Sequence, residues 1–141
     1  MSESTTQAPP QAGTFCWHEV CVREPEKAKA FYTELFGWDT ETMPMPPESG
    51  VSEYTMFKPK NAPHVAGIQH MVGEQWEGVP PHWIAYIAVD DIHASTAKAA
   101  ELGAEIKVPV FPVGDMGHMS VIQDPAGAAF CMWQQGNPDC G

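Results

Sequence analysis

The chain has 141 residues, of which 43% are hydrophobic, and seven Lys plus Arg against eighteen Asp plus Glu give a formal net charge of -11. This length and apolar content suit one compact domain. The negative charge disfavours nucleic acid and anionic membrane surfaces as partners. Because no apolar run approaches the roughly 20 residues that span a bilayer, we expect a soluble, cytoplasmic protein.

The two ends of the chain differ from its middle in composition. Residues 1–13 are polar and aperiodic, which predicts a disordered N-terminal tail, and residues 136–141 are expected to form a C-terminal tail. The folded domain should therefore cover 14–135. Its cysteines and the one in the tail contain no CxxC pair, so we expect reduced thiols rather than a disulfide framework. These are Cys16, Cys21, Cys131 and Cys140.

The first half, residues 14–72, predicts a strand, a helix and three further strands. The strand FCWHEVCV is rich in β-branched and aromatic residues. A helix is expected to begin at Pro25, a favoured first-turn residue, and to end at Gly37. Three extended segments, separated by Pro, Gly and Asn, follow. They are 38–43, 53–57 and 65–71.

After a linker at residues 73–81, the same order of elements occurs again over 82–135. Glu24 and Asp91 are 67 positions apart, and so are Leu35 and Leu102. Asp91 is expected to cap the second helix and Gly103 to end it. Further strands are expected at 105–110, 118–123 and 128–134. A fixed offset of this kind indicates two copies of one unit, here βαβββ.

Paired βαβββ modules with the motifs FYTELFGW, VDDI and DPAGAAFCMWQ resemble the vicinal oxygen chelate superfamily. This superfamily includes glyoxalase I, extradiol dioxygenases, fosfomycin-resistance transferases and bleomycin-binding proteins. The resemblance implies an α+β fold in which a curved mixed sheet forms a cup-like ligand cavity, with the helices on its convex side. It also implies a homodimer.

The resemblance also says where metal ligands would lie. In metal-dependent relatives the first-strand ligand is seven residues before the acidic residue at the helix start, which gives Trp17 and Ile84 here. Another ligand lies four residues after the glycine of the DPxG turn, which gives Cys131, and the first-module counterpart falls near Gly67. These residues do not make a hard-metal site. No cofactor is therefore expected, although a divalent metal at shifted positions stays open.

Strand alternation assigns the candidate site residues, because side chains on one strand face alternate sides. On this register Glu19 faces the cavity and His18 faces away. We expect Glu19 to act as acid or base, since burial among aromatic rings should raise the pKa of its carboxyl group. Tyr86 and His82 are expected to orient the substrate. The expected binding residues are Trp17, Ile84, Cys131, Trp133 and His118.

Three functions fit this cavity. The first is a metal-independent lyase, isomerase or hydrolase acting on a small polar metabolite through Glu19. The second is an antibiotic-sequestering protein without catalysis, which the acidic chain and aromatic residues would suit. The third is a metal-dependent lyase or dioxygenase with nonstandard ligands. Its ligands would be drawn from Glu19, His64, His70, His82 and His118.

Overall fold

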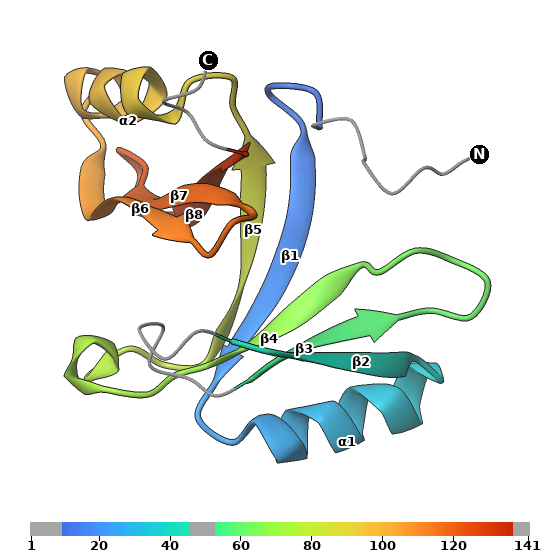
Figure 1. Ribbon diagram of the computed structural model, residues 1–141. Coiled ribbons are helices and arrows are strands. Elements are labelled where there is room, and N and C mark those ends of the chain that lie inside the picture. The colour runs from blue at the N-terminus through green and yellow to red at the C-terminus, as the bar shows by residue number, and fades with distance from the viewer. Residues whose placement is uncertain (1–9, 46–52, 137–141) are drawn as a thin grey trace. The chain divides into compact units, whose positions relative to one another are not determined.

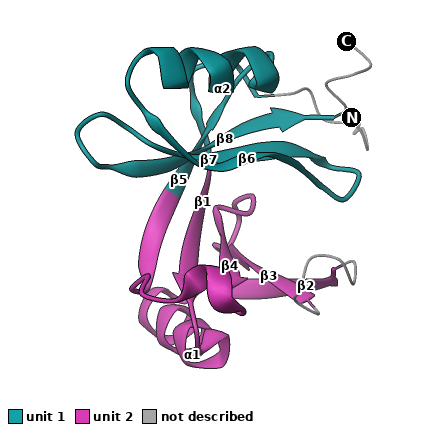
Figure 2. Ribbon diagram, turned by 90° about the vertical axis from the view of Figure 1, so that its left-hand side faces the viewer, with its two compact units in different colours: residues 1–16, 85–141 teal, residues 17–84 magenta. Residues whose placement is uncertain are grey.

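The computed structural model describes residues 10–45 and 53–136. The chain forms two compact units, which Figure 2 distinguishes by colour: unit 1 comprises residues 1–16 and 85–141, and unit 2 comprises residues 17–84. Residues 1–9 of the predicted N-terminal tail and residues 137–141 of the C-terminal tail, with Cys140, lie outside the described residues.

Unit 2 is a βαβββ module followed by a short 3-10 helix. Within it the strand order is β2-β3-β4-β1, with β1 and β4 parallel and the other neighbours antiparallel. Helix α1 lies along this sheet (Figure 1). The elements are β1 (Phe15–Val22, whose first two residues belong to unit 1), α1 (Pro25–Phe36), β2 (Asp39–Pro44), β3 (Glu53–Lys58), β4 (Ala66–His70) and η2 (Glu74–Trp76).

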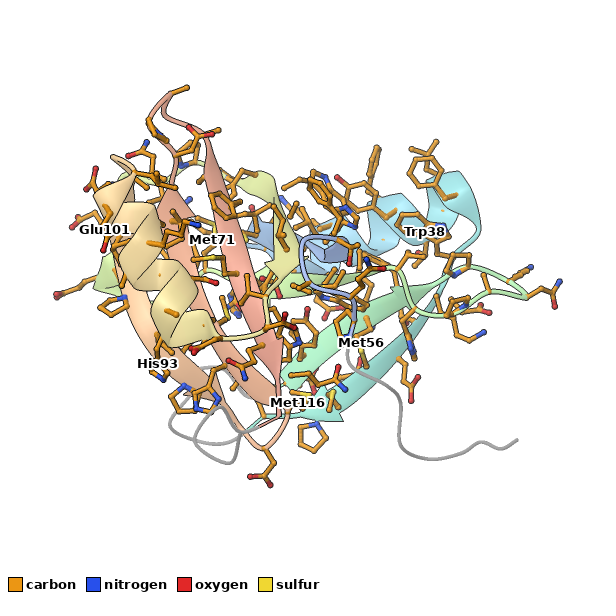
Figure 3. The ribbon with its side chains drawn as sticks, turned by 90° about the horizontal axis from the view of Figure 1, so that it is seen from above. Trp38, Met56, Met71, His93, Glu101 and Met116 are labelled. Atoms are coloured by element: carbon orange, nitrogen blue, oxygen red, sulfur yellow. The ribbon has the colours of Figure 1, made fainter. Side chains whose placement is uncertain are left out.

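The ends and the packing of α1 follow from its sequence. Pro25 occupies the first turn, and Gly37 ends the helix in the left-handed conformation at φ 72°. Tyr32 and Trp38 pack against a buried cluster formed by β1, β3 and β4. The cluster consists of Val20, Phe57, Ala66 and Ile68. Figure 3 shows Trp38 beside α1.

Unit 1 contains the second βαβββ module, with the strand order β5-β8-β7-β6. Strands β5 and β8 are parallel, whereas β7 pairs antiparallel with both β6 and β8. The Asp91 side chain accepts a hydrogen bond from the Ala94 amide at 3.1 Å and caps α2, as predicted. The elements are β5 (His82–Ala88, whose first three residues belong to unit 2), α2 (Ile92–Glu101), β6 (Glu105–Val113), β7 (Gly117–Gln123) and β8 (Ala129–Gln135).

The strand β6 is longer than the sequence indicated. It extends to Val113 instead of ending at residue 110, and its register with β7 shifts twice between Ile106 and Phe111. Pro109 and Pro112 lie within it. Proline cannot donate to the sheet and is therefore tolerated on an edge strand and near bulges, which is where the strand order places β6.

The α+β class and the two βαβββ modules are thus confirmed. The units divide β1 after Cys16 and β5 after Ile84, so the module boundaries at 14–72, 73–81 and 82–135 stay predictions. So does the cup-like cavity, which would take residues from both modules. Cys16, Cys21 and Cys131 are thiols not joined in disulfides. No helix among the described residues is long and apolar enough to cross a membrane.

Candidate functional site

A buried carboxylate lies at the centre of β1 in unit 2. Glu19 is 5% exposed and the neighbouring His18 is exposed, but Val20 and Cys21 are buried as well, so burial along β1 does not alternate. Burial of an acidic side chain is costly unless hydrogen bonds replace its lost water. The hydrogen-bond partners of Glu19 therefore determine which chemistry its carboxylate group can carry out.

Tyr54 supplies one such partner from strand β3. Its hydroxyl group donates a hydrogen bond to Glu19 Oε2 at 2.7 Å and accepts one from Trp17 Nε1 at 2.9 Å. The indole group can only donate, so the phenolic proton is directed toward the carboxylate. The two hydrogen bonds form a chain in which Trp17 donates to Tyr54 and Tyr54 donates to Glu19. We call these three residues the Glu19 relay.

Gly67 makes the Glu19 relay sterically possible. It lies opposite Glu19 in the parallel pairing of β1 with β4, and opposite Met56 of β3; Figure 3 labels Met56. A Cβ atom built on Gly67 would overlap with the hydroxyl group and ring of Tyr54. The absent side chain of Gly67 thus leaves the space that the end of Tyr54 occupies.

The electrostatics of the Glu19 relay favour a fixed proton on Tyr54. Burial raises the pKa of Tyr54 well above its usual value, and the negative charge of Glu19 and the hydrogen bond to it raise this pKa further; the bond from Trp17 opposes the shift. Burial, then the charge of Glu19, raises the pKa of Cys21 to about 12. Cys21 is therefore an unreactive thiol at neutral pH.

The corresponding strand positions of unit 1 carry different groups. Tyr86, 67 positions after Glu19, pairs in register with Cys131 as Glu19 pairs with Gly67. This confirms that Gly67 and Cys131 are equivalent. Cys131 is 2% exposed. The Tyr86 hydroxyl group donates to Met119 Sδ at 3.8 Å, a weak contact compared with that of Tyr54.

The other predicted site residues fall in both units. Trp133 of β8 lies in register with Met119 and Ala88, and its ring covers Gly117. His118 lies in β7 opposite Gln134, within the strand predicted at 118–123.

His82 and Ile84 lie at the start of β5 in unit 2. His82 Nδ1 is 2.8 Å from the carbonyl oxygen of Pro80, and Ile84 is 9% exposed. Among the predicted residues, the structure brings Trp17 together with Glu19 in unit 2, and Tyr86 together with Cys131 in unit 1. The sequence reasoning missed Tyr54. The glycine inside a strand at position 67 was the available signal.

The residues at the expected ligand positions do not fit a divalent metal. Trp17 has only a donor nitrogen, which is bonded to Tyr54, and the place of a ligand side chain at Gly67 is filled by the phenol of Tyr54. Ile84 has no donor atom, and Cys131 adds one buried thiol. Within residues 10–45 and 53–136, no three His, Cys, Asp or Glu side chains gather in a metal-binding group.

A surface hollow of about 450 Å³ lies elsewhere in unit 2, next to the 3-10 helix η2. Arg23 lines it and donates hydrogen bonds to the carbonyl oxygens of Trp76 and Val79 at 2.7 and 2.8 Å. The guanidinium group thus holds the segment after β4 in place. The hollow takes no residue of the Glu19 relay, so the relay is the stronger candidate site. Trp76 is the last residue of η2.

These features occur in a chain that belongs to the glyoxalase/bleomycin resistance protein/dioxygenase superfamily, whose family model matches residues 14–132. A crystal structure of a hypothetical protein of Bacillus halodurans superposes with a TM-score of 0.64, at 13% identity, over 90% of this chain and 97% of that one. A methylmalonyl-CoA epimerase of Streptomyces coelicolor gives 0.63 at 13% identity, over 90% and 100% of the two chains. At such identities these similarities concern the fold alone.

Two curated relatives are more similar in sequence. CFP32 of Mycobacterium tuberculosis, provisionally named a glyoxylase, is 43% identical over 122 residues, which are 86% of this chain and 46% of CFP32. The anthracycline biosynthesis protein DnrV of Streptomyces peucetius is 32% identical over 134 residues, 88% of this chain and 48% of DnrV. The chain therefore spans about half the length of these relatives.

Proposed function

We propose that this chain is a metal-independent enzyme of the lyase or isomerase type that uses Glu19 to move a proton on a small polar metabolite. The observation that carries the proposal is the Glu19 relay. A buried carboxylate whose Oε2 accepts from Tyr54, itself fixed by Trp17, is held in one orientation. A held carboxylate of this kind is suited to general acid or base catalysis.

The step that such a carboxylate can perform is proton abstraction next to a carbonyl group. The C–H bond breaks, the proton passes to Glu19, and the electron pair moves into the carbonyl to give an enolate. Return of the proton on either face gives isomerisation, and loss of a β-substituent gives elimination. Tyr54 contacts Glu19 and is therefore proposed as a positioning residue for this step.

The test uses exchange with solvent, since the substrate is not known. The protein is incubated in D2O with a panel of small 2-oxo and 3-oxo acids, and deuterium uptake at the carbon next to the carbonyl is followed by NMR. We expect uptake that falls by roughly 10²- to 10⁴-fold in Glu19→Gln. Tyr54→Phe should lower the rate by a smaller factor and change its pH profile.

The matched control is Glu34→Gln, which makes the same change at an exposed position on α1. It should leave the exchange rate unchanged. Full exchange by folded Glu19→Gln would rule out the proposed role of this residue. The expected contributions of Tyr86 and His82, as groups that orient the substrate, stay predictions that the same assay can test with Tyr86→Phe and His82→Gln.

A second candidate is the sequestering protein without catalysis, and the similarity to an anthracycline biosynthesis protein supports it. Under this alternative the chain would bind an anthracycline, with quenching of Trp fluorescence, without turnover. Binding that survives Glu19→Gln, combined with no exchange on any oxo acid, would favour it. A cytoplasmic location is expected under both candidates and stays a prediction.

A metal-dependent reaction with nonstandard ligands is less well supported. His64, one of its proposed ligands, lies 2.6 Å from the carboxylate of Glu41, and His118 Nδ1 lies 3.4 Å from the Gly136 carbonyl oxygen. The described residues hold no metal-binding group of three. Elemental analysis of untagged protein, with activity measured before and after addition of a chelator, would detect a metal enzyme.

A further inference from the structure

The surface hollow next to η2 is lined by charges of both signs. It has a volume of about 450 Å³, and its lining consists of Arg23, Gly73, Glu74, Trp76 and Glu77. Small-molecule sites have volumes of roughly 300 to 1,000 Å³, so the hollow is large enough for one metabolite. Figure 1 shows η2 as the yellow-green coil between β4 and β5. The hollow takes no residue of the Glu19 relay, so a ligand there would be held by different residues.

Arg23 keeps part of its guanidinium group available to a ligand. Both of its hydrogen bonds, to the carbonyl oxygens of Trp76 and Val79, are donated by Nη2. A guanidinium group also has N–H groups on Nη1 and Nε, which these two bonds do not use. Arg23 is exposed and lines the hollow. It can therefore hold the segment after β4 and bind a carboxylate group at the same time.

Glu74 and Glu77 bring negative charge to the same hollow without neutralising Arg23. Both glutamates are exposed. Within residues 10–45 and 53–136, no ion pair joins either of them to a Lys, Arg or His side chain. Their carboxylates can accept hydrogen bonds from an ammonium group. Opposite charges that line one hollow and do not pair with each other suit a ligand that carries both charges.

Trp76 adds an aromatic side chain to the lining. It is partly buried, in contrast to the exposed charged residues of the hollow. An indole ring offers a large apolar contact area to another side chain. Its face also attracts an ammonium group. The ligand that fits the whole lining therefore has an apolar side chain in addition to its two charges.

Hydrogen bonds within the chain hold this segment in shape. Gly73 has φ 108°, a conformation that favours glycine. The Gln75 side chain donates to the Val72 carbonyl oxygen at 3.0 Å. The Trp76 amide donates to the Gly73 carbonyl oxygen at 3.2 Å, and the Val79 amide donates to that of Trp76 at 3.0 Å. A lining that is already ordered loses less conformational freedom when a ligand binds.

We propose that this hollow binds a free α-amino acid with an apolar side chain. The carboxylate group of the ligand binds Arg23, and its ammonium group binds Glu74 or Glu77. Its side chain packs on Trp76. A zwitterion is favoured over an ion of either sign, because the two glutamates and the net charge of -11 oppose an anion, whereas Arg23 opposes a cation. This inference is independent of the proposed reaction.

The experiment compares four ligands by NMR titration of the ¹⁵N-labelled 141-residue chain, followed at the Gly73 amide and the Trp76 indole N–H. L-phenylalanine is the probe. L-phenylalaninamide lacks the carboxylate, N-acetyl-L-phenylalanine lacks the ammonium group, and L-alanine lacks the ring. We expect L-phenylalanine to bind with a dissociation constant of about 1 mM or below, and each of the three losses to raise it at least about tenfold. The amide and the N-acetyl compound also represent the two ends of a peptide.

Variants assign the protein groups. Glu74→Gln combined with Glu77→Gln should raise the dissociation constant of L-phenylalanine at least about tenfold and should not weaken N-acetyl-L-phenylalanine, which has no ammonium group. The matched control is Glu26→Gln combined with Glu34→Gln, which removes two charges at exposed positions of α1. It should leave both dissociation constants unchanged. Trp76→Leu should remove the preference for L-phenylalanine over L-alanine.

The Arg23 contact is tested by the ligand rather than by a substitution, because Arg23→Gln would also release the segment that this residue holds. L-phenylalaninamide probes the same contact in the unchanged protein. The proposal would be overturned by the absence of shifts at Gly73 and Trp76 up to about 10 mM L-phenylalanine. Equal binding of L-phenylalanine and its amide, or equal effects of the two double variants, would overturn it as well.

Discussion

The two βαβββ modules place different chemistry on equivalent strand positions. In unit 2, Glu19 lies opposite Gly67, and in unit 1 Tyr86 lies opposite Cys131. Tyr54 comes two residues before Met56, the partner of Gly67, and Met119 comes two residues before Val121, the partner of Cys131. The pair Tyr54–Glu19 in unit 2 therefore corresponds to the pair Met119–Tyr86 in unit 1.

One small residue explains much of this difference. Gly67 leaves room for a phenol to reach a carboxylate, whereas the equivalent Cys131 fills its own place with a buried thiol. The same strand pairing can therefore hold a polar hydrogen-bonded chain in one module and a contact between a tyrosine hydroxyl group and a methionine sulfur in the other.

The largest loss of stability is expected when Gly67 of unit 2 is replaced by cysteine, the residue at the equivalent position 131 of unit 1. Gly67→Cys puts a side chain into the space of the Tyr54 hydroxyl group, which adds strain and breaks a buried hydrogen bond. We expect the free energy of unfolding to fall by roughly 3 to 5 kcal/mol. Denaturant unfolding monitored by fluorescence measures the change.

The control for that substitution gives unit 2 both residues of unit 1, the cysteine at position 67 and the methionine at position 54. Gly67→Cys combined with Tyr54→Met should be more stable than the sum of the two single effects predicts, by about 1 kcal/mol or more. Simple additivity of the two changes would mean that Gly67 and Tyr54 do not compete for the same space.

Removal of the Tyr54 hydroxyl group should have the next largest effect. Tyr54→Phe takes a partner from both Trp17 Nε1 and Glu19 Oε2, and we expect a loss of roughly 2 to 4 kcal/mol. Met119→Leu, the change at the equivalent position of unit 1, conserves volume and should cost less than about 1.5 kcal/mol. Thermal and denaturant unfolding of both variants would measure the difference; equal losses would contradict the account.

The stability should also fall at alkaline pH. The pKa values of Cys21 and Tyr54 are raised in the folded protein from ordinary values of 9.0 and 10.0, that of Cys21 to about 12. The unfolded chain therefore loses these protons first as the pH rises. The contribution of these groups to the free energy of unfolding is therefore fully present below about pH 9. It decreases above that pH, by at most about 1.4 kcal/mol per pH unit for each group.

This pH dependence can be divided among its groups. Burial also raises the pKa of Cys16 from its ordinary value of 9.0, so Cys21→Ala should reduce the decrease that begins near pH 9 without abolishing it. Tyr54→Phe should remove the part that begins near pH 10, the ordinary value of that side chain. The measurement is the free energy of unfolding at intervals between about pH 8 and pH 11. An unchanged slope in Tyr54→Phe would show that the phenol does not hold its proton as described.

The smallest difference is expected at the helix starts. Asp91 accepts a hydrogen bond from the Ala94 amide, whereas Glu24 makes no capping hydrogen bond with its side chain. Asp91→Ala should cost about 1 kcal/mol, and Glu24→Ala at most a few tenths, because its ion pair with Lys27 is exposed. Thermal unfolding of the two variants compares them; a larger loss for Glu24→Ala would be contrary to expectation.

The fold was predictable because its signals are local and repeated. Pro25 and Gly37 mark the ends of one helix and Asp91 begins the other, as the structure confirms. The full length of β6 was not predictable in this way, since prolines usually end a strand and here lie on an edge strand with register shifts.

The candidate site was predictable only in part. Strand periodicity selected Trp17 and Glu19, but their link through Tyr54 depends on the register of β3 against β4 and spans 35 residues between Glu19 and Tyr54. Periodicity within one strand carries no information on such a register. Gly67 indicated a close approach of another group without identifying that group.

The most direct test of the Glu19 relay is a double-mutant cycle on its central hydrogen bond. The free energies of unfolding of wild type, Glu19→Gln, Tyr54→Phe and the double variant give the coupling between the two side chains, which lie 2.7 Å apart. The account predicts a coupling of at least about 1 kcal/mol, as for a hydrogen bond to a charged group. Additive effects, with a coupling near zero, would contradict it.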